Sequence, residues 1–188
     1  MKYDIILAGV GGQGVLSVAA IIAAAAMKDG LRVRQSEVHG MSQRGGGVQA
    51  HLRISDEAIA SDLIPTGRAD MILSMEPLES LRYLAWLKPE GIVITASEPF
   101  INIPNYPQTE QVYEAVNSLP KSRIVETEKL ALEAGNRKSE NIVLIGAAME
   151  HIPVSRESLG QAIYERFIAK DSKLVDINMK ALELGAAS

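Results

Sequence analysis

The sequence contains no cysteine at all. A chain without thiols forms no disulfide bond, supplies no thiolate ligand to an iron–sulfur cluster and has no thiol nucleophile. This composition favours a cytoplasmic protein. Aromatic residues are also scarce, at 4% of 188 residues, so the core must be built largely from aliphatic side chains.

Positive charge is not in excess either. The net charge is −4, which argues against a nucleic-acid-binding surface. Residues 5–27 carry no charge and have the length of a membrane span. Four glycines and Gln13 interrupt this stretch, however, and a mid-helix glycine costs about 1 kcal/mol relative to alanine. A buried strand followed by a buried helix explains the same residues, so we expect no membrane role.

The first chemical signal is the loop Gly9-Val10-Gly11-Gly12-Gln13-Gly14. It separates a strand predicted over residues 3–8 from a helix predicted over 14–28. In this arrangement backbone N–H groups and the helix dipole converge on an anion. We therefore expect an anionic cofactor group to bind at Gly11, Gly12, Gln13 and Gly14. A glycine turn that only lets strand and helix pack closely is the alternative.

A second glycine-rich loop follows a strand predicted over residues 31–38. Residues 39–47 contain four glycines and no apolar period, and they bring together imidazole, hydroxyl, amide and guanidinium groups: His39, Ser42, Gln43 and Arg44. An arginine in such a set suits a bidentate grip on a phosphate or a carboxylate. An exposed hairpin tip without a ligand is the alternative. Both loops follow parallel strands, so they should share one edge of the sheet.

The alternation over residues 48–54 predicts a half-exposed strand, antiparallel to its predecessor, with His51 at a surface or interface. We further predict a short edge strand over 58–63, strands over 69–75, 92–95 and 123–126, and helices over 77–87, 108–118 and 128–134. From residue 139 onward the patterns are helical, and the last helix should begin at Asp171 or Ser172 and end at Gly185.

These patterns predict one domain over residues 1–188. Its expected fold class is α/β: a Rossmann-like open, mostly parallel sheet with an antiparallel hairpin insertion and a helical C-terminal third.

No self-contained catalytic set is visible. His39, His51 and His151 lack metal-ligand spacing, so we assign neither a metal site nor a catalytic residue. Glu37 lies where a dinucleotide-binding domain holds the ribose hydroxyls. A stand-alone nucleotide-binding or regulatory module therefore remains an alternative, as does an interaction scaffold whose glycine loop binds nothing.

Residues 9–16 and 37–46, in this order and spacing, resemble the gamma-type domain of the 2-oxoacid:ferredoxin oxidoreductases. The segment 69–83 is also similar to that family. Among these enzymes the chain is most similar to the small (beta) subunit of the indolepyruvate type. The resemblance covers most of the chain and is weakest after about residue 134.

The resemblance implies a subunit of a thiamine-diphosphate-dependent enzyme that decarboxylates a 2-oxoacid, reduces ferredoxin and forms acyl-coenzyme A. Thiamine diphosphate and the iron–sulfur clusters would belong to a large alpha subunit. This chain would shape the active site and be inactive alone. Its first glycine loop would hold a coenzyme A phosphate or a partner carboxylate, and His39, Ser42, Gln43 and Arg44 would contact the large subunit. An isolated chain would expose interface surface, which favours a homodimer.

Overall fold

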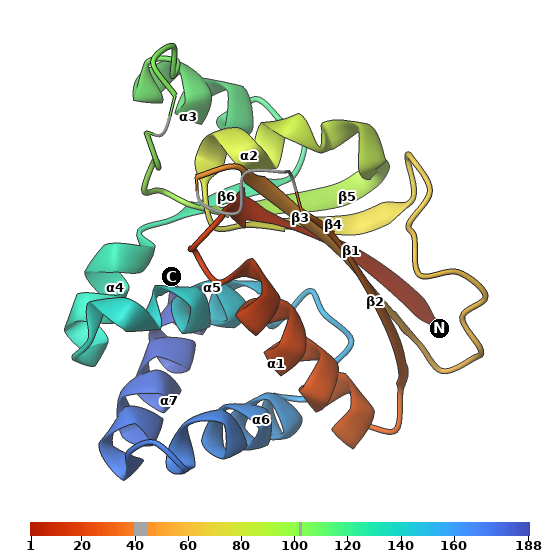
Figure 1. Ribbon diagram of the computed structural model, residues 1–188, viewed down its shortest axis with the longest axis vertical. Helices are drawn as coiled ribbons and strands as arrows, with labels where there is room; N and C mark the ends of the chain where they lie inside the picture. The colour runs from red at the N-terminus through yellow and green to blue at the C-terminus, as the bar shows by residue number, and fades with distance from the viewer. Residues whose placement is uncertain (40–44, 102) are drawn as a thin grey trace.

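The computed structural model describes residues 1–39, 45–101 and 103–188, and the side chains of all of these except 38 and 39. Figure 1 shows the arrangement of the elements. In chain order they are β1 (Lys2–Val10), α1 (Val15–Lys28), β2 (Arg32–His39), β3 (Gly47–Ser55), β4 (Ala69–Ser74), α2 (Pro77–Arg82), η1 (Leu84–Trp86), β5 (Leu87–Ala96), α3 (Thr109–Asn117), β6 (Ser122–Val125), α4 (Thr127–Ala134), η2 (Arg137–Ser139), α5 (Glu140–Ala148), α6 (Arg156–Ile168) and α7 (Ser172–Ala187).

The strands form one six-stranded sheet in the order β2-β3-β1-β4-β5-β6. β1, β4, β5 and β6 are parallel neighbours, whereas β3 is antiparallel to both β1 and β2. All elements after β6 are helices. The predicted open, mostly parallel sheet with an antiparallel hairpin and a helical C-terminal third is therefore confirmed.

Helices cover both faces of the sheet (Figure 1). α1 and α5 lie on one face with α4, α6 and α7 beyond them, and α2 and α3 lie on the other. Ile5 and Leu7 belong to the core on the α1 side, whereas Ile6 belongs to the smaller core with Tyr83 and Trp86. Because successive side chains of a strand point to opposite faces, burial on both faces explains the continuous apolar run of β1.

β3 corrects one prediction, because it is not half-exposed. Every residue from Gln49 to Ser55 is buried. Ala50, Leu52 and Ile54 pack in the core on the α1 side. The opposite face carries polar residues, which alternation alone would place in water, yet they are buried too. The strand lies between β2 and β1.

The segment after β3 covers this polar face. Arg53 donates from Nε and Nη2 to the two carboxylate oxygens of Asp4, at 2.9 and 3.1 Å. Its Nη1 donates to the carbonyl oxygens of Ser61 and Leu63, at 3.0 and 2.9 Å. Residues 58–63 are therefore held by a side chain and form no strand, so the predicted edge strand is wrong. Charge-assisted bonds to Arg53 replace the ladder that a strand would make.

The helix predicted over 77–87 is shorter than expected. α2 ends at Arg82, residues 84–86 form a 3₁₀ turn, and β5 already begins at Leu87. Leu87 pairs with Ala69 of β4, and a register shift separates this pair from Met71–Ile92. Pairing with β4 thus overrides the helical spacing of the leucines.

α7 corrects a second boundary, because it continues through Gly185 to Ala187. Gly185 does not end the helix but permits the crossing with α5. A Cβ atom there would overlap the carbonyl of Val143, and one at Gly146 would overlap the carbonyl of Leu182. The two helices therefore approach at a pair of glycines. No helix within the described ranges is long and apolar enough to cross a membrane.

We predict that Gly185→Ala lowers the free energy of unfolding by about 1–3 kcal/mol, because the added methyl group must push two backbones apart. The measurement is urea denaturation. Gly160→Ala in α6 is the matched control, since its Cβ would meet only the flexible end of Met179, at 3.2 Å. Alanine has the higher helix propensity, so this variant should be as stable as the parent or more stable. Equal losses in both variants would contradict the helix-crossing explanation.

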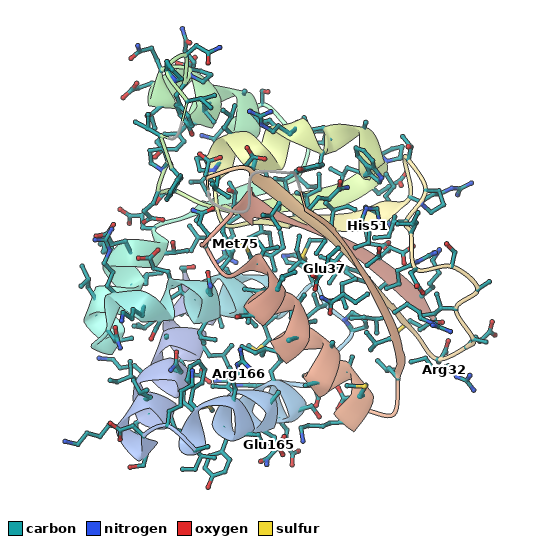
Figure 2. The ribbon with its side chains drawn as sticks, in the orientation of Figure 1. Arg32, Glu37, His51, Met75, Glu165 and Arg166 are labelled. Atoms are coloured by element: carbon teal, nitrogen blue, oxygen red, sulfur yellow. The ribbon has the colours of Figure 1, made fainter. Side chains whose placement is uncertain are left out.

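His51, labelled in Figure 2, is 4% exposed, so of the expected surface or interface position the structure excludes an exposed surface. Its Nδ1 accepts a hydrogen bond from the backbone N–H of Ile64 at 2.9 Å, which requires the neutral ring. Burial, and then the charge of Arg53, lower the pKa of His51 below its ordinary value.

A lowered pKa in the folded state means that the unfolded chain binds the proton more readily. The contribution of His51 to stability is therefore present above about pH 6.5 and is lost as the pH falls toward the folded-state pKa. We expect urea midpoints of His51→Gln to fall less between pH 7.5 and 5 than those of the parent. His151→Gln, at an exposed position, should keep the parental slope.

Candidate functional site

The first glycine loop has the shape that the sequence predicts, and it connects β1 to α1. Gly12 and Gly14 adopt positive φ values of 106° and 80°, a region that other residues rarely enter. Gly14 is the N-cap of α1. The strand–loop–helix arrangement is confirmed.

The side chain of Gln13 fastens this loop to the sheet. Its Oε1 accepts from the backbone N–H of Val10 at 2.7 Å, and its Nε2 donates to the carbonyl of Met75 at 3.1 Å. Met75 follows β4, and Figure 2 places it near the N-terminus of α1. Both ends of the Gln13 amide are thus bonded within the chain, so this side chain positions the loop.

The backbone donors of the loop divide into two groups. The N–H of Gly11 donates to Gly46 O at 2.9 Å, and the N–H of Gln13 donates to Val10 O at 3.0 Å. Among the described residues, the N–H groups of Gly12, Gly14 and Val15 have no acceptor. The N–H of Leu16 has none either, so four donors are free for an anion at the N-terminus of α1.

The second glycine loop begins at the same edge of the sheet. Gly45 N donates to Gly11 O at 3.5 Å, which with the Gly11–Gly46 bond joins the two loops directly. The prediction of a shared edge is confirmed. His39 is the last residue of β2, but its side chain is not described. Ser42, Gln43 and Arg44 lie outside the described residues, so the roles assigned to these four side chains stay predictions.

α5 supplies the opposite wall of the site. Asn141 Nδ2 donates to the carbonyl of Gln13 at 2.8 Å, although 128 positions separate the two residues. A cavity of about 340 Å³ lies between the two walls, lined by Gly12, Gln13, Gly14, Arg137, Lys138, Glu140 and Asn141. A smaller cavity shares Gln13, Glu140 and Asn141 and reaches Met75, just after β4, and Ala96, the last residue of β5.

The larger cavity has two cations and one carboxylate. Arg137 is exposed and pairs with Glu128 and Glu140, at 3.0 and 3.3 Å. Lys138 is exposed, and its ammonium group makes no ion pair within the described residues. Burial, and then the charge of Glu98, raise the pKa of Glu140. With the N-termini of α1 and α5 beside it, the cavity favours an anion on the Lys138 side.

The sequence offered no local signal for Arg137, Lys138 and Asn141. They precede or begin a helix and match no binding motif by themselves. Only the packing of α5 beside the glycine loop gives them a place in the site.

Glu37 is not placed as a dinucleotide-binding domain requires. β3 lies between β1 and β2, so Glu37 is two strand spacings, roughly 10 Å, from the strand that carries the glycine loop. In a dinucleotide-binding domain the acidic residue ends the strand directly beside β1. This geometry argues against an independent NAD site. Figure 2 shows Glu37 on the edge strand β2.

The site occupies the point where the strand order reverses. From β1 the chain leads through α1 toward β2, whereas β4 leads through α2 to β5 on the other side. Open α/β sheets bind ligands outside the carboxyl ends of strands at such a point. Fold and site together define a Rossmann-like α/β domain with a glycine loop at the strand-order switch.

The chain belongs to the pyruvate ferredoxin/flavodoxin oxidoreductase family, whose model matches residues 4–188. It is 41% identical to the indolepyruvate oxidoreductase subunit IorB of Pyrococcus horikoshii over 194 residues, which covers 98% of this chain and 94% of the relative. The resemblance drawn from the two glycine motifs is therefore confirmed.

Solved structures agree with this assignment. The gamma subunit of a keto/oxoacid ferredoxin oxidoreductase from Geobacter sulfurreducens matches with a TM-score of 0.71 at 27% identity, covering 98% of this chain and 94% of that chain. A 2-oxoglutarate:ferredoxin oxidoreductase from Magnetococcus marinus, with 2-oxoglutarate, coenzyme A and succinyl-CoA bound, matches with a TM-score of 0.78. This chain covers 30% of that one at 22% identity, so the match shows a shared fold.

We predict that Gln13→Ala lowers the free energy of unfolding by about 1–3 kcal/mol, because it leaves Val10 N–H and Met75 O without their partners. Backbone amide exchange at Val10 should accelerate. The control is Gln35→Ala, which removes one exposed bond to Glu37 and should change stability by less than about 0.5 kcal/mol. If both variants unfold alike, Gln13 does not position the loop.

Proposed function

We propose that this chain is the non-cluster subunit of a thiamine-diphosphate-dependent 2-oxoacid:ferredoxin oxidoreductase, with an aryl pyruvate such as indolepyruvate as substrate. Family membership and the 41% identity to an indolepyruvate oxidoreductase subunit support this. The residues 1–188 would act as one gamma-type domain in the cytoplasm.

The side chains of this subunit do not fit the redox cofactors of the reaction. An iron–sulfur cluster needs thiolate ligands, and the chain has no cysteine. The chain also lacks the Gly-Asp-Gly…Asn-Asn type of motif that is typical of thiamine diphosphate sites. Both cofactors would therefore belong to a large alpha subunit, which passes electrons to ferredoxin.

The contribution of this chain would be an anion site next to the partner's active site. Its support is the set of free N–H groups at the start of α1, beside a cavity that Lys138 and Arg137 also line: those of Gly12, Gly14, Val15 and Leu16. A phosphate of coenzyme A suits these donors, and coenzyme A is present in the Magnetococcus marinus structure. His39, Ser42, Gln43 and Arg44 would contact the large subunit at the same edge.

The test is a kinetic comparison of complexes reconstituted with the large subunit. Lys138→Ala should raise the KM for coenzyme A by about three- to tenfold and leave kcat nearly unchanged, because it removes a charge that binds but does not react. Added salt should shrink the difference between parent and variant. Lys173→Ala, an exposed lysine in α7, is the control.

An unchanged KM in Lys138→Ala would refute the assignment of this cavity to coenzyme A. Tight binding of NAD⁺ to the isolated chain in calorimetry would support instead the stand-alone nucleotide-binding module. A chain that never associates with a thiamine-dependent large subunit would refute the whole proposal. Sedimentation of the isolated chain tests the expected homodimer.

A further inference from the structure

Within the described part of the chain, one buried side-chain oxygen has no hydrogen-bond partner: Oε2 of Glu79. Glu79 lies in α2 and is 5% exposed. Its other oxygen accepts from Nε of Arg82 at 2.9 Å, and that arginine side chain is half-exposed. A buried acceptor without a donor is costly, and native structures retain few such atoms. Glu79 therefore requires an explanation.

The free oxygen lies at the edge of the sheet where both glycine loops begin. A Cβ atom at Gly47 would lie 3.0 Å from Glu79 Oε2 and 3.7 Å from the hydroxyl oxygen of Tyr83. Gly47 pairs with Val10, the last residue of β1. Gly47 is exposed and has no side chain, so the carboxylate oxygen lies close below an open backbone position.

The neighbouring carboxylate, Glu76, is satisfied within the chain. Its Oε2 accepts from the backbone N–H of Glu79 at 2.7 Å, and its Oε1 accepts from Phe100 N–H and from the hydroxyl of Tyr106. The two buried carboxylates thus differ. Glu76 caps α2 and holds the segment around Phe100, whereas Glu79 keeps one oxygen for a group that the described chain does not supply.

The missing donor can be characterised by the charges around this oxygen. Burial, and then the nearby Glu76, raise the pKa of Glu79, while Arg82 acts in the opposite direction. Burial and the charge of Glu79 also raise the pKa of Tyr83. Glu79 thus lies between a second buried carboxyl group, Glu76, and a single arginine whose side chain is half-exposed. A guanidinium or ammonium group would supply both the missing donor and a positive charge.

We propose that Glu79 Oε2, with the Tyr83 hydroxyl beside it, binds an arginine or lysine side chain of the large subunit when the two subunits assemble. This inference rests on the proposed function, because it places the partner at the sheet edge that carries the glycine loops. The site is an assembly contact on α2, on the opposite face of the sheet from the anion cavity, which lies between the first glycine loop and α5.

The first experiment is calorimetric titration of the chain with the large subunit. Glu79→Gln keeps the shape but removes the charge, so assembly should weaken about ten- to a hundredfold, the range for a bond to a charged group. Tyr83→Phe should weaken it less. Glu57→Gln, in an exposed turn, is the control and should assemble like the parent. The isolated Glu79→Gln chain should melt no lower than the parent.

A second readout separates an assembly contact from a structural role. The titration of the Glu79 carboxyl, followed by NMR in the isolated chain and in the complex, should move to lower pH on assembly, because a cation stabilises the carboxylate. An unmoved titration indicates a bound water or no partner and overturns the inference. Parental affinity of Glu79→Gln overturns it as well.

These outcomes are distinguishable from failure of the proposed function. If the parent chain assembles and Glu79→Gln assembles equally well, the proposed function stands and the contact at Glu79 is refuted. If the parent chain does not assemble with the large subunit, both are refuted.

Discussion

The amide of Gln13 joins the ends of β1 and β4 at the point where the strand order reverses, and the site depends on this joint. With both ends of the amide bonded, the loop between the two strands is fixed with Gly12 and Gly14 at positive φ. Asn141 then connects the same loop to α5. Strands, loop and C-terminal helices therefore meet at a single residue.

Two kinds of polar burial support this arrangement. At the amino end of β1, Arg53 donates to the carboxylate of Asp4 and to the carbonyl oxygens of two residues after β3, Ser61 and Leu63. The arginine therefore holds the segment that follows β3 against the sheet. At the carboxyl end, the carboxylate of Glu79 keeps an unpaired oxygen. Among the described residues, Asp4 and Arg53 are paired at the amino end of β1, whereas N–H groups of the glycine loop and Oε2 of Glu79 lack partners at the carboxyl end. The proposed interface with the large subunit at the carboxyl edge of the sheet explains this difference.

Residues 3–8, 14–28 and 69–75 were predictable, because each element depends on its own periodicity and on neighbouring glycines or prolines. The errors share one cause. β3 alternates like an exposed strand, yet its polar face is covered by a distant segment. The helix before β5 was predicted too long, because pairing with β4 determines where β5 begins. Local patterns report a preference, and long-range pairing decides the outcome.

The sequence by itself determined the fold class, the strand–glycine loop–helix order, the shared edge of the two loops and the family, because these follow from local conformation and motif spacing. Only the tertiary structure decided which donors of the loop are free, since Gly11 donates to a residue of the second loop. It also placed Arg137, Lys138 and Asn141 opposite the glycines and left Oε2 of Glu79 without a hydrogen-bond partner. Such contacts join positions far apart in the chain, and no local preference encodes them.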